Sequence, residues 1–415
     1  MSDFVARAIA ARREMRKVFA ETPLQKNEHL SQIYAADIFL KREDLSPVRS
    51  YKIRGAFNAM RKHLDAFPAQ KRFVCASAGN HAQGVAFVCR HFDVHGVIYM
   101  PITTPEQKVN KTKIFGGGNI EIRLVGDYFE DTLKAAQEYC ITEKAVFLAP
   151  FDDLDVIEGQ ATVAVELMEQ SNEPIDLVIL PVGGGGLSAG VVTYLKALSP
   201  NTEFRFVEPT GAKSLAAALA AKNPVTLEKV DSFVDGAAVA RIGDLTFDVL
   251  SGVDPNTVFA APEDRICMTI TELLNVEGIV LEPAGAMSID VLKDLTLEIK
   301  GKRIVCITSG GNFDFERLPE VKERALKYAG RKKYFILRFP QRPGALKEFL
   351  SILGPDDDIT RFEYLKKSAR NFGTVLIGIE TRDPAEFPII CARMLDAGMR
   401  FQDITDDDGL TQFLI

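Results

Sequence analysis

The lysine at position 52 stands in the segment VRSYKIRGAFNAM, which begins at Val48, between an aromatic residue, Tyr51, and the small-residue run RGA. A lysine on a solvated surface needs no such neighbours, and most lysines are solvated charges. A lysine desolvated in a pocket has a lowered pKa, so its amine can attack a carbonyl carbon and later accept a proton. Taken alone, Lys52 is better explained as a solvated charge, and it becomes a candidate for chemistry only if the rest of the chain supplies a partner for it.

A loop of small and polar residues, SAGNHAQG, runs from Ser77 to Gly84 directly after the apolar run RFVCA. Small residues let backbone N–H groups approach a ligand, and N–H groups at the start of a helix attract a carboxylate or another anion. Asn80 adds a side-chain donor. An ordinary helix start has the same composition, so this loop alone leaves both interpretations open.

A second loop, VGGGGLSAG from Val182 to Gly190, holds four consecutive glycines after another apolar run. Such a run costs conformational entropy, and a backbone that wraps a phosphate at the start of a helix accounts for it. No Gly-Lys-Ser/Thr follows, and the G-x-G-x-x-G register with a later acidic residue is missing. The loop therefore predicts a phosphate that belongs to neither a nucleoside triphosphate nor a dinucleotide. A plain flexible turn is the alternative.

A third loop, TSGGN from Thr308 to Asn312, follows the run RIVCI with a hydroxyl group and two glycines. Together, the lysine, the glycine loop, the asparagine and the serine match four needs of pyridoxal phosphate. These are an amine for its aldehyde, a cradle for its phosphate, a donor for its ring oxygen and a partner for its pyridine nitrogen. The sequence therefore predicts pyridoxal 5'-phosphate as the cofactor.

These loops need a scaffold that brings strand ends together. The first ~325 residues alternate short apolar runs, rich in Val and Ile, with stretches of helical spacing, and near-continuous apolarity indicates strands of a parallel sheet buried on both faces. The alternation predicts a doubly wound α/β fold, in which ligands bind beyond the carboxyl ends of the strands. The predicted strands are 72–77, 94–100, 119–125, 145–151, 175–182, 203–209 and 303–309, and the helical stretches include 81–92 and 187–198.

The charged segment PEVKERALKYAGRKKY marks a change of character along the chain. We place a domain boundary there, with a catalytic region of two α/β subdomains at 1–328 and a second domain at 329–415. The predicted order in the second domain is strand, helix, strand, strand, helix, strand, which is a ferredoxin-like α+β module. Its runs are 334–340, 344–353, 358–365, 373–380, 384–398 and 399–405, with a turn at 369–373.

Composition narrows the possible function classes. Of 415 residues, 47% are hydrophobic and 26% charged, and the net charge of −7 argues against a nucleic-acid partner, which favours a basic face. No apolar run reaches the ~18 residues of a membrane helix, and the first residues do not predict a signal peptide. The five histidines show no H-E-x-x-H spacing, so we expect no dedicated metal site. Six cysteines without a C-x-x-C pair indicate reduced core residues of a cytoplasmic protein.

The segments SYKIRGA, SAGNHAQGVA, GGGGL and TSGGN, in this order and spacing, resemble the fold-type II pyridoxal-phosphate enzymes. Over nearly the whole chain, including MPITTPEQKVNKTKIFGGGNIEIRLVG and the tail motif LRFPQRPGALKEFL, the sequence is similar to the threonine dehydratases (threonine ammonia-lyases) of isoleucine biosynthesis. One tail module is typical of the short biosynthetic form of this family, with a single ACT-like regulatory domain. Any one motif is shared with the serine dehydratases and racemases.

The resemblance implies a role for each motif residue. Lys52 would form the Schiff base and then remove the α-proton of the substrate, between Tyr51 and Gly236 on opposite faces of the cofactor ring. Asn80 would donate to the ring oxygen. Ser309 would face the pyridine nitrogen without forcing its protonation, which favours prompt loss of a β-hydroxyl group. The phosphate would be held by Gly183, Gly184, Gly185, Gly186 and Leu187, and the substrate carboxylate by Ser77, Ala78, Gly79, Asn80 and His81. The role of Glu282, which matches a family position near the site, stays open.

The implied reaction converts L-threonine to 2-oxobutanoate and ammonia. L-Serine would be a poorer substrate, since one methyl group in a hydrophobic pocket discriminates by only about 1–3 kcal/mol. A serine dehydratase or racemase is the alternative among enzymes, but the tail argues against both, and Ala78 stands where racemases have a second serine. A non-catalytic amino-acid sensor is the alternative outside enzymes, and the retained Lys52 argues against it.

The resemblance further implies that the tail binds isoleucine and thereby slows catalysis, that valine opposes this effect, and that the protein is a homotetramer. The turn FPQRPGAL precedes a predicted helix, whose N–H groups could hold the carboxylate of an amino acid. The candidate effector residues are Arg342, Pro343 and Gly344. A tight turn with a surface arginine explains the same residues equally well.

Overall fold

The structure is a computed structural model that describes residues 2–365, 371–407 and 409–410. The chain divides into two compact units. The first comprises Met1–Glu263 and Ile279–Phe313, and the second comprises Asp264–Gly278 and Asp314–Ile415. Part of the turn predicted at 369–373 lies outside the described residues.

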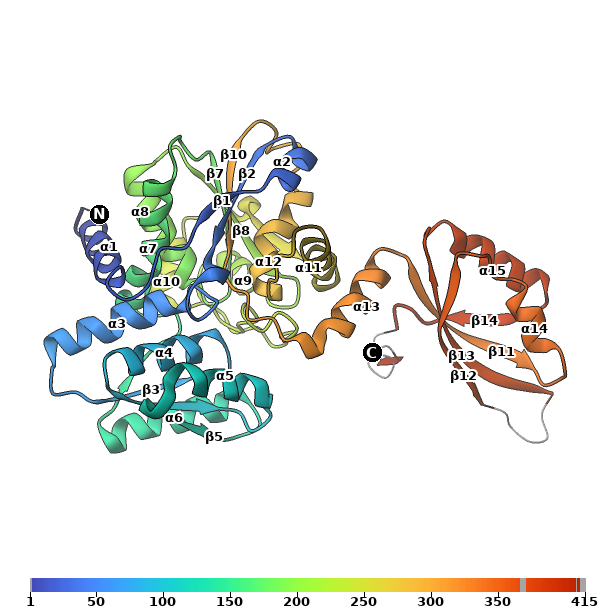
Figure 1. The fold of residues 1–415 in the computed structure, drawn as a ribbon, viewed down its shortest axis with the longest axis horizontal. Coiled ribbons are helices and arrows are strands. Elements are labelled where there is room, and N and C mark those ends of the chain that lie inside the picture. The colour runs from blue at the N-terminus through green and yellow to red at the C-terminus, as the bar shows by residue number, and fades with distance from the viewer. Residues whose placement is uncertain (1, 366–370, 408, 411–415) are drawn as a thin grey trace. The chain divides into compact units, whose positions relative to one another are not determined.

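A six-stranded sheet forms the large lobe of the first unit. Its strands lie in the order β1-β2-β10-β7-β8-β9, and all neighbours are parallel except β1, which pairs antiparallel with β2. Figure 1 shows α7 and α8 on one side of this sheet and α12 on the other. The strands are β1 (Leu24–Lys26), β2 (Asp37–Arg42), β7 (Leu177–Pro181), β8 (Glu203–Pro209), β9 (Val258–Ala261) and β10 (Arg303–Thr308).

A four-stranded parallel sheet, in the order β5-β4-β3-β6, forms the small lobe. Successive residues of its central strand β3 point to opposite faces, as the strand geometry requires. Phe73 and Cys75 join the core beneath α4, whereas Val74 and Ala76 join the core beneath α6. The strands are β3 (Arg72–Ala76), β4 (His95–Met100), β5 (Ile120–Leu124) and β6 (Val146–Phe147).

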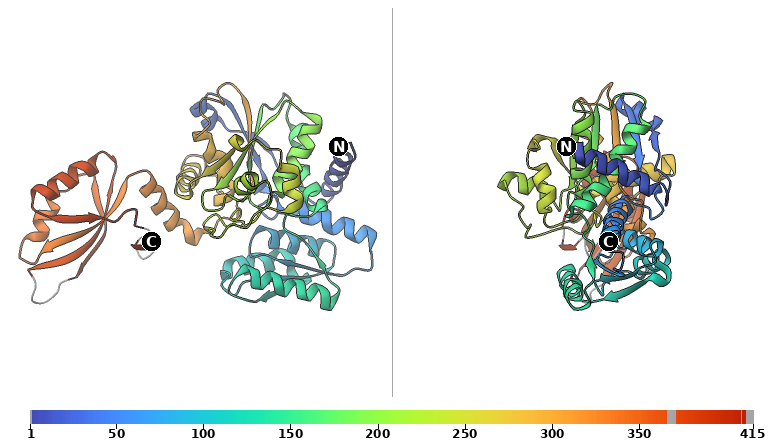
Figure 2. Two further views of the ribbon diagram at one scale, coloured as in Figure 1. Left: turned by 180° about the vertical axis from the view of Figure 1, so that it is seen from behind. Right: turned by 90° about the vertical axis from the view of Figure 1, so that its left-hand side faces the viewer.

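The helix α3 (Lys52–Ala66) lies at the junction of the two lobes and packs against α4 (Asn80–His91) and α7 (Leu154–Gln170) (Figure 1, Figure 2). Glycines permit the close crossing of α3 and α7. A Cβ atom on Gly159 would stand 2.6 Å from the carbonyl oxygen of Arg54, and one on Gly55 would stand 2.4 Å from Nε2 of Gln160. This crossing fixes the first turn of α3, where Lys52 lies.

The remaining helices of the first unit cover these sheets or connect their strands. Asp153 begins α7, because its carboxylate accepts the N–H groups of Asp155 and Val156. The other helices are α1 (Ser2–Met15), α2 (Glu28–Tyr34), α5 (Glu106–Gly116), α6 (Phe129–Glu143), α8 (Gly186–Leu198), α9 (Ser214–Ala221), α10 (Asp244–Leu250) and α12 (Pro283–Asp290).

The second unit contains a four-stranded antiparallel sheet in the order β12-β13-β11-β14, with α14 and α15 on one face (Figure 1). Phe335 and Leu337 of the sheet pack against Phe349 of α14 and Ile390 of α15. Its elements are α11 (Glu263–Glu277), α13 (Leu318–Tyr328), β11 (Lys332–Pro340), α14 (Ala345–Leu350), β12 (Asp357–Leu365), β13 (Phe372–Thr381), α15 (Glu386–Asp396) and β14 (Arg400–Asp403).

The predicted fold class is confirmed: parallel sheets with helices on both faces precede a β-α-β-β-α-β module. All seven strands predicted for the catalytic region are present. The strands β1, β2 and β9 were not predicted, because they are short or rich in polar residues. In the described part of the chain, no helix is both long and apolar enough to cross a membrane.

Candidate active site

The amine of Lys52 lies at the start of α3 among apolar and carbonyl groups. Its Nζ donates a hydrogen bond to the carbonyl oxygen of Pro150 at 2.8 Å. The same atom stands 5.4 Å from the ring centre of Tyr51 and 5.8 Å from that of Phe151. Burial of the amine lowers the pKa of Lys52 to about 8, and the nearby Glu282 opposes this shift. A substantial fraction of the amine is therefore neutral near physiological pH, as a nucleophile or base requires.

The four-glycine loop joins β7 to α8 next to this lysine. Gly185 has a φ of 88°, a left-handed conformation that favours glycine. Gly184 faces the ring of Phe151, where a Cβ atom would stand 2.3 Å from the ring. The first-turn N–H groups of α8 have no carbonyl partner within their own helix. The loop therefore presents backbone donors at a helix start.

A small cavity joins these features. Its volume is about 20 Å³, and it brings the glycine loop, Lys52, Tyr51 and Gly236 together. The full lining is Tyr51, Lys52, Phe151, Pro181, Gly183, Gly184, Gly185, Gly186, Leu187, Gly236 and Val239. Of the groups that pyridoxal phosphate requires, the cavity brings together an amine for the aldehyde and backbone donors for the phosphate, with an aromatic face and a small residue beside them. The hydroxyl of Ser188, in the first turn of α8, is also buried without a hydrogen-bond partner among the described residues. The residues present therefore fit this cofactor.

Ser309 is held beside Lys52 through the backbone. It follows β10 directly, and its carbonyl oxygen accepts the N–H of Tyr51 at 3.1 Å. Ser50 and Gly310 form an antiparallel bridge, and the N–H of Gly311 donates to the carbonyl oxygen of Arg49 at 2.8 Å. The third loop is thus bonded to the segment that carries the lysine.

Asn80 begins α4 and lies against Glu282. Its Nδ2 donates to Oε1 of Glu282 at 2.6 Å, and its Oδ1 accepts a hydrogen bond from Nδ2 of Asn312 at 2.7 Å. Burial raises the pKa of Glu282 to about 8, and the charge of Asp235 adds to this effect, whereas Asn80, Lys108 and Lys111 oppose it. Glu282 is therefore a buried carboxyl group in direct contact with a predicted cofactor residue.

The helix α4, which begins in the loop from Ser77 to Gly84, packs on the start of α3. A Cβ atom on Gly84 would stand 3.2 Å from the backbone of Lys52 and Ile53, so the glycine permits this close approach. Nε2 of His81 lies 2.9 Å from the carbonyl oxygen of Leu148. Burial, together with the charge of Lys52, lowers the pKa of His81 to about 3. His81 is thus neutral, and its Nε2–H donates to Leu148 instead of serving as a base.

The segment from Pro150 to Asp153 is a part of the site that the sequence analysis missed. Pro150 accepts the hydrogen bond of Lys52, Phe151 covers the glycine loop, and Asp152 accepts the N–H groups that begin α10. Asp153 begins α7. The contact of Glu282 and Asn312 with Asn80 was also missed. The signal that could have indicated this segment is Asp153, a carboxylate directly before the helix α7.

The effector candidates lie in the second unit. Arg342 is exposed and pairs with Glu348 at 2.6 Å, Pro343 is exposed, and Gly344 has a φ of 83° before α14. This geometry is that of a tight turn. It adds no ligand-specific feature to the three residues.

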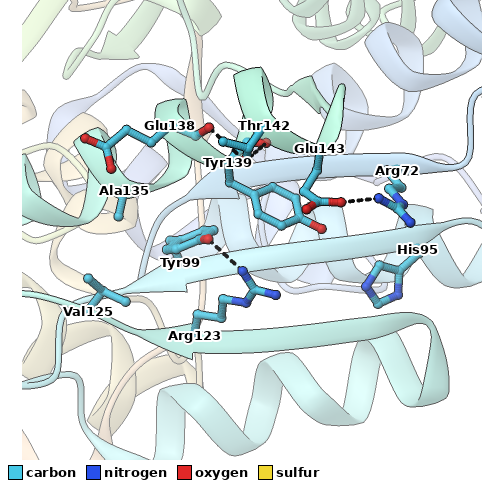
Figure 3. Close-up of a pocket in the computed structure, with 10 residues that line it drawn as sticks. All are labelled: Arg72, His95, Tyr99, Arg123, Val125, Ala135, Glu138, Tyr139, Thr142 and Glu143. Carbon is cyan, nitrogen blue, oxygen red and sulfur yellow. Dashed lines mark hydrogen bonds and ion pairs between the residues drawn. The ribbon is translucent and has the colours of Figure 1, made fainter.

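A larger hollow of about 650 Å³ lies on the small lobe, between its sheet and α6 (Figure 3). There the guanidinium of Arg123 donates to the hydroxyl of Tyr99 at 3.0 Å and stands 4.8 Å from the ring centre of Tyr139. Arg72 pairs with Glu143. These cations already have partners, and no glycine loop lines the hollow, so we place the active site at the smaller cavity. Among the described residues, no group of three or more His, Cys, Asp or Glu side chains is arranged to hold a metal ion.

Two family models match the chain. Residues 15–310 match the family model "pyridoxal-phosphate dependent enzyme", and residues 323–414 match "C-terminal regulatory domain of threonine dehydratase". The chain is 47% identical over 412 residues to the L-threonine dehydratase biosynthetic IlvA of Bacillus subtilis (strain 168), covering 99% of this chain and 97% of that protein.

Two solved structures are also similar. The processed form of threonine deaminase isoform 2 from Solanum lycopersicum matches with a TM-score of 0.72 and 36% identity, over 78% of this chain and 89% of that one. Maize serine racemase matches with a TM-score of 0.70 and 28% identity, over 78% of this chain and 98% of that one.

Proposed function

Because the chain belongs to the pyridoxal-phosphate-dependent enzymes, and among them to the biosynthetic threonine dehydratases with a C-terminal regulatory domain, we propose how its own residues carry out the reaction. The protein is a threonine ammonia-lyase. It converts L-threonine to 2-oxobutanoate and ammonia in isoleucine biosynthesis. The assignment of the site rests on one observation: Lys52 and the four-glycine loop line the same cavity.

When bound, pyridoxal phosphate withdraws electrons from the α-carbon of the substrate. Lys52 would attach it, since its amine is the one that lines the cavity. The backbone of Gly183, Gly184, Gly185, Gly186 and Leu187 would hold the phosphate at the start of α8. Tyr51 and Gly236 would enclose the ring, and Asn80 would donate to its oxygen. Ser309, a neutral partner for the pyridine nitrogen, would leave that nitrogen unprotonated.

Lys52 would also move the proton. Once its amine is released, the lowered pKa keeps part of it neutral and able to accept the α-proton of threonine. The carbonyl oxygen of Pro150 holds Nζ in place by accepting one of its hydrogen bonds. His81 is neutral and engaged with Leu148, so it does not compete as a base. The N–H groups of the loop from Ser77 to His81 would hold the substrate carboxylate.

L-Serine would be the poorer substrate, because it lacks only the methyl group of threonine. Similarity to a serine racemase keeps racemisation as the second candidate activity. Ala78 argues against it, because a residue without a hydroxyl group cannot supply a proton to the opposite face of the α-carbon.

The regulatory domain binds an effector. We propose that this effector is isoleucine, that valine opposes it, and that the protein assembles as a homotetramer. The open edges of the regulatory sheet, β12 and β14, support pairing with a second copy. The six cysteines are free, which supports a reducing compartment such as the cytoplasm.

A 2-oxo-acid assay tests this function. The purified protein is given threonine or serine, with and without isoleucine. We expect faster product formation from threonine and inhibition by isoleucine. Production of D-serine at a rate above that of oxo acid would instead support a racemase.

A further inference from the structure

A chain of side-chain hydrogen bonds runs from a backbone carbonyl to Glu282. Nδ2 of Asn312 donates to the carbonyl oxygen of Val48 at 2.8 Å and to Oδ1 of Asn80 at 2.7 Å. Nδ2 of Asn80 then donates to Oε1 of Glu282 at 2.6 Å. These residues come from four separate segments of the chain.

The chemistry of the groups fixes the direction of this chain. A backbone carbonyl oxygen only accepts, so the amide of Asn312 must turn its nitrogen toward Val48. The same nitrogen faces Asn80, which must therefore present its oxygen. The nitrogen of Asn80 is left facing Glu282. An amide side chain can otherwise turn over with little change of shape, so both neighbours are needed to hold one orientation.

Glycines make room for this arrangement. A Cβ atom on Gly310 would stand 2.0 Å from Oε1 of Glu282 and 3.2 Å from Nδ2 of Asn80. A Cβ atom on Gly285 would stand 2.1 Å from the carbonyl oxygen of Gly310. Residues 308–312 and residues 281–286 thus pack closely at the point where Asn80 meets Glu282. Glu282 is only 5% exposed.

We propose that Glu282 and Asn312 are positioning residues that clamp the amide of Asn80 from both sides, so that its second N–H is directed at the ring oxygen of the cofactor. This inference rests on the proposed role of Asn80. The amide nitrogen carries two hydrogens, and one of them is used on Glu282. The second has no partner among the described residues. Glu282 therefore acts through Asn80 as a hydrogen-bond acceptor.

The test compares two cofactors in each variant. Cofactor-free protein is titrated with pyridoxal 5'-phosphate and with 3-deoxypyridoxal 5'-phosphate, which lacks the ring oxygen, and the two Kd values are read from absorbance. Their ratio measures the contact at the oxygen. Removing the ring oxygen also changes the intrinsic reactivity of the cofactor, but this change is the same in every variant. It therefore cancels when the Kd ratios of two variants are compared, as in a double-mutant cycle.

Three substitutions probe the clamp. Glu282→Met removes the acceptor at similar length, and Asn312→Ala removes the donor on the other side. Each should reduce the preference for the natural cofactor about fivefold, the effect of one ordinary hydrogen bond. Glu282→Gln keeps an acceptor oxygen and should retain the wild-type ratio. Melting temperatures and circular dichroism identify variants that do not fold. If the variant at Glu282 or the variant at Asn312 does not fold, the other one still tests the clamp.

Glu208→Gln is the matched control. Glu208 is as buried as Glu282 and accepts backbone N–H groups of α9 instead of the Asn80 amide, so its loss should leave the ratio unchanged. An unchanged ratio in Glu282→Met and Asn312→Ala, or an equal loss in Glu282→Gln, overturns the clamp. Asn80→Ala distinguishes a failure of the clamp from a failure of the proposed role of Asn80. If it leaves the ratio unchanged, the proposed role of Asn80 fails as well. If it lowers the ratio while the clamp variants do not, only the clamp fails.

Discussion

The lowered pKa of Lys52 predicts how the uptake of pyridoxal phosphate depends on pH. Only a neutral amine attacks the aldehyde. With a pKa of about 8, Lys52 is about one-quarter neutral at pH 7.5, whereas an ordinary lysine is about one-thousandth neutral. The neutral fraction of Lys52 should therefore exceed that of a surface lysine by about two hundredfold at this pH.

Stopped-flow absorbance measures this uptake in cofactor-free protein between pH 6.5 and 10.5. The rate should rise with pH through a midpoint near 8 and then level off, because the amine is fully neutral above its pKa. Since Glu282 raises the pKa of Lys52, Glu282→Gln should move the midpoint to lower pH. Lys52→Ala supplies the background from the other lysines.

A midpoint near 10.5 would refute this reasoning, because the amine would then be solvated as in an ordinary lysine. Uptake by Lys52→Ala at the wild-type rate would refute the assignment of the lysine itself. A midpoint near 8 that does not move in Glu282→Gln would show that Glu282 does not oppose the effect of burial on the pKa of Lys52.

Three further predictions concern other parts of the chain. Gly184→Asp should yield protein with little cofactor and a lower melting temperature, because an anionic side chain would repel the phosphate and strike Phe151; full cofactor occupancy by absorbance would contradict the phosphate site. Ser309→Asp should keep the pyridine nitrogen protonated, slow elimination and increase side reactions; an unchanged product ratio and rate would count against the neutral-partner argument. A chain ending at Tyr328, confirmed as folded by circular dichroism, should keep dehydratase activity and lose inhibition by isoleucine, since it lacks β11 to β14; a truncate still inhibited would place the effector site in the catalytic region.

The strands and loops that lead to the site could be predicted because their signals are local. Apolar runs such as RFVCA and RIVCI, bounded by Gly, Ser or Asn, appear as β3 and β10 with nearly the predicted limits. The strand β2 was missed because its sequence, DIFLKR, mixes charged and apolar residues. Lys41 and Arg42 of this strand are buried. Lys41 forms an ion pair with Glu166 and Arg42 forms one with Asp44, and no local sequence pattern reveals these pairs.

The contacts inside the site could not be predicted for the same reason. Phe151 meets the glycine loop, and Glu282 meets Asn80, across long stretches of sequence. Two residues that are far apart in one sequence leave no local pattern that marks their contact. The roles of the individual site residues therefore stay predictions, although the structure brings the lysine, the glycines, Tyr51 and Gly236 to one cavity.

The position of β10 governs how the protein can fold while it is being synthesised. This strand is the last of its sheet to leave the ribosome, yet it lies at the centre, between β2 and β7. Until it arrives, β2 lacks its parallel partner and β7 has an open edge, and synthesis of the residues between β7 and β10 takes on the order of ten seconds. Ser309 follows β10 directly, and its carbonyl oxygen accepts the N–H of Tyr51. If Ser309 holds the pyridine nitrogen as proposed, the cofactor site is complete only after the largest sheet has closed.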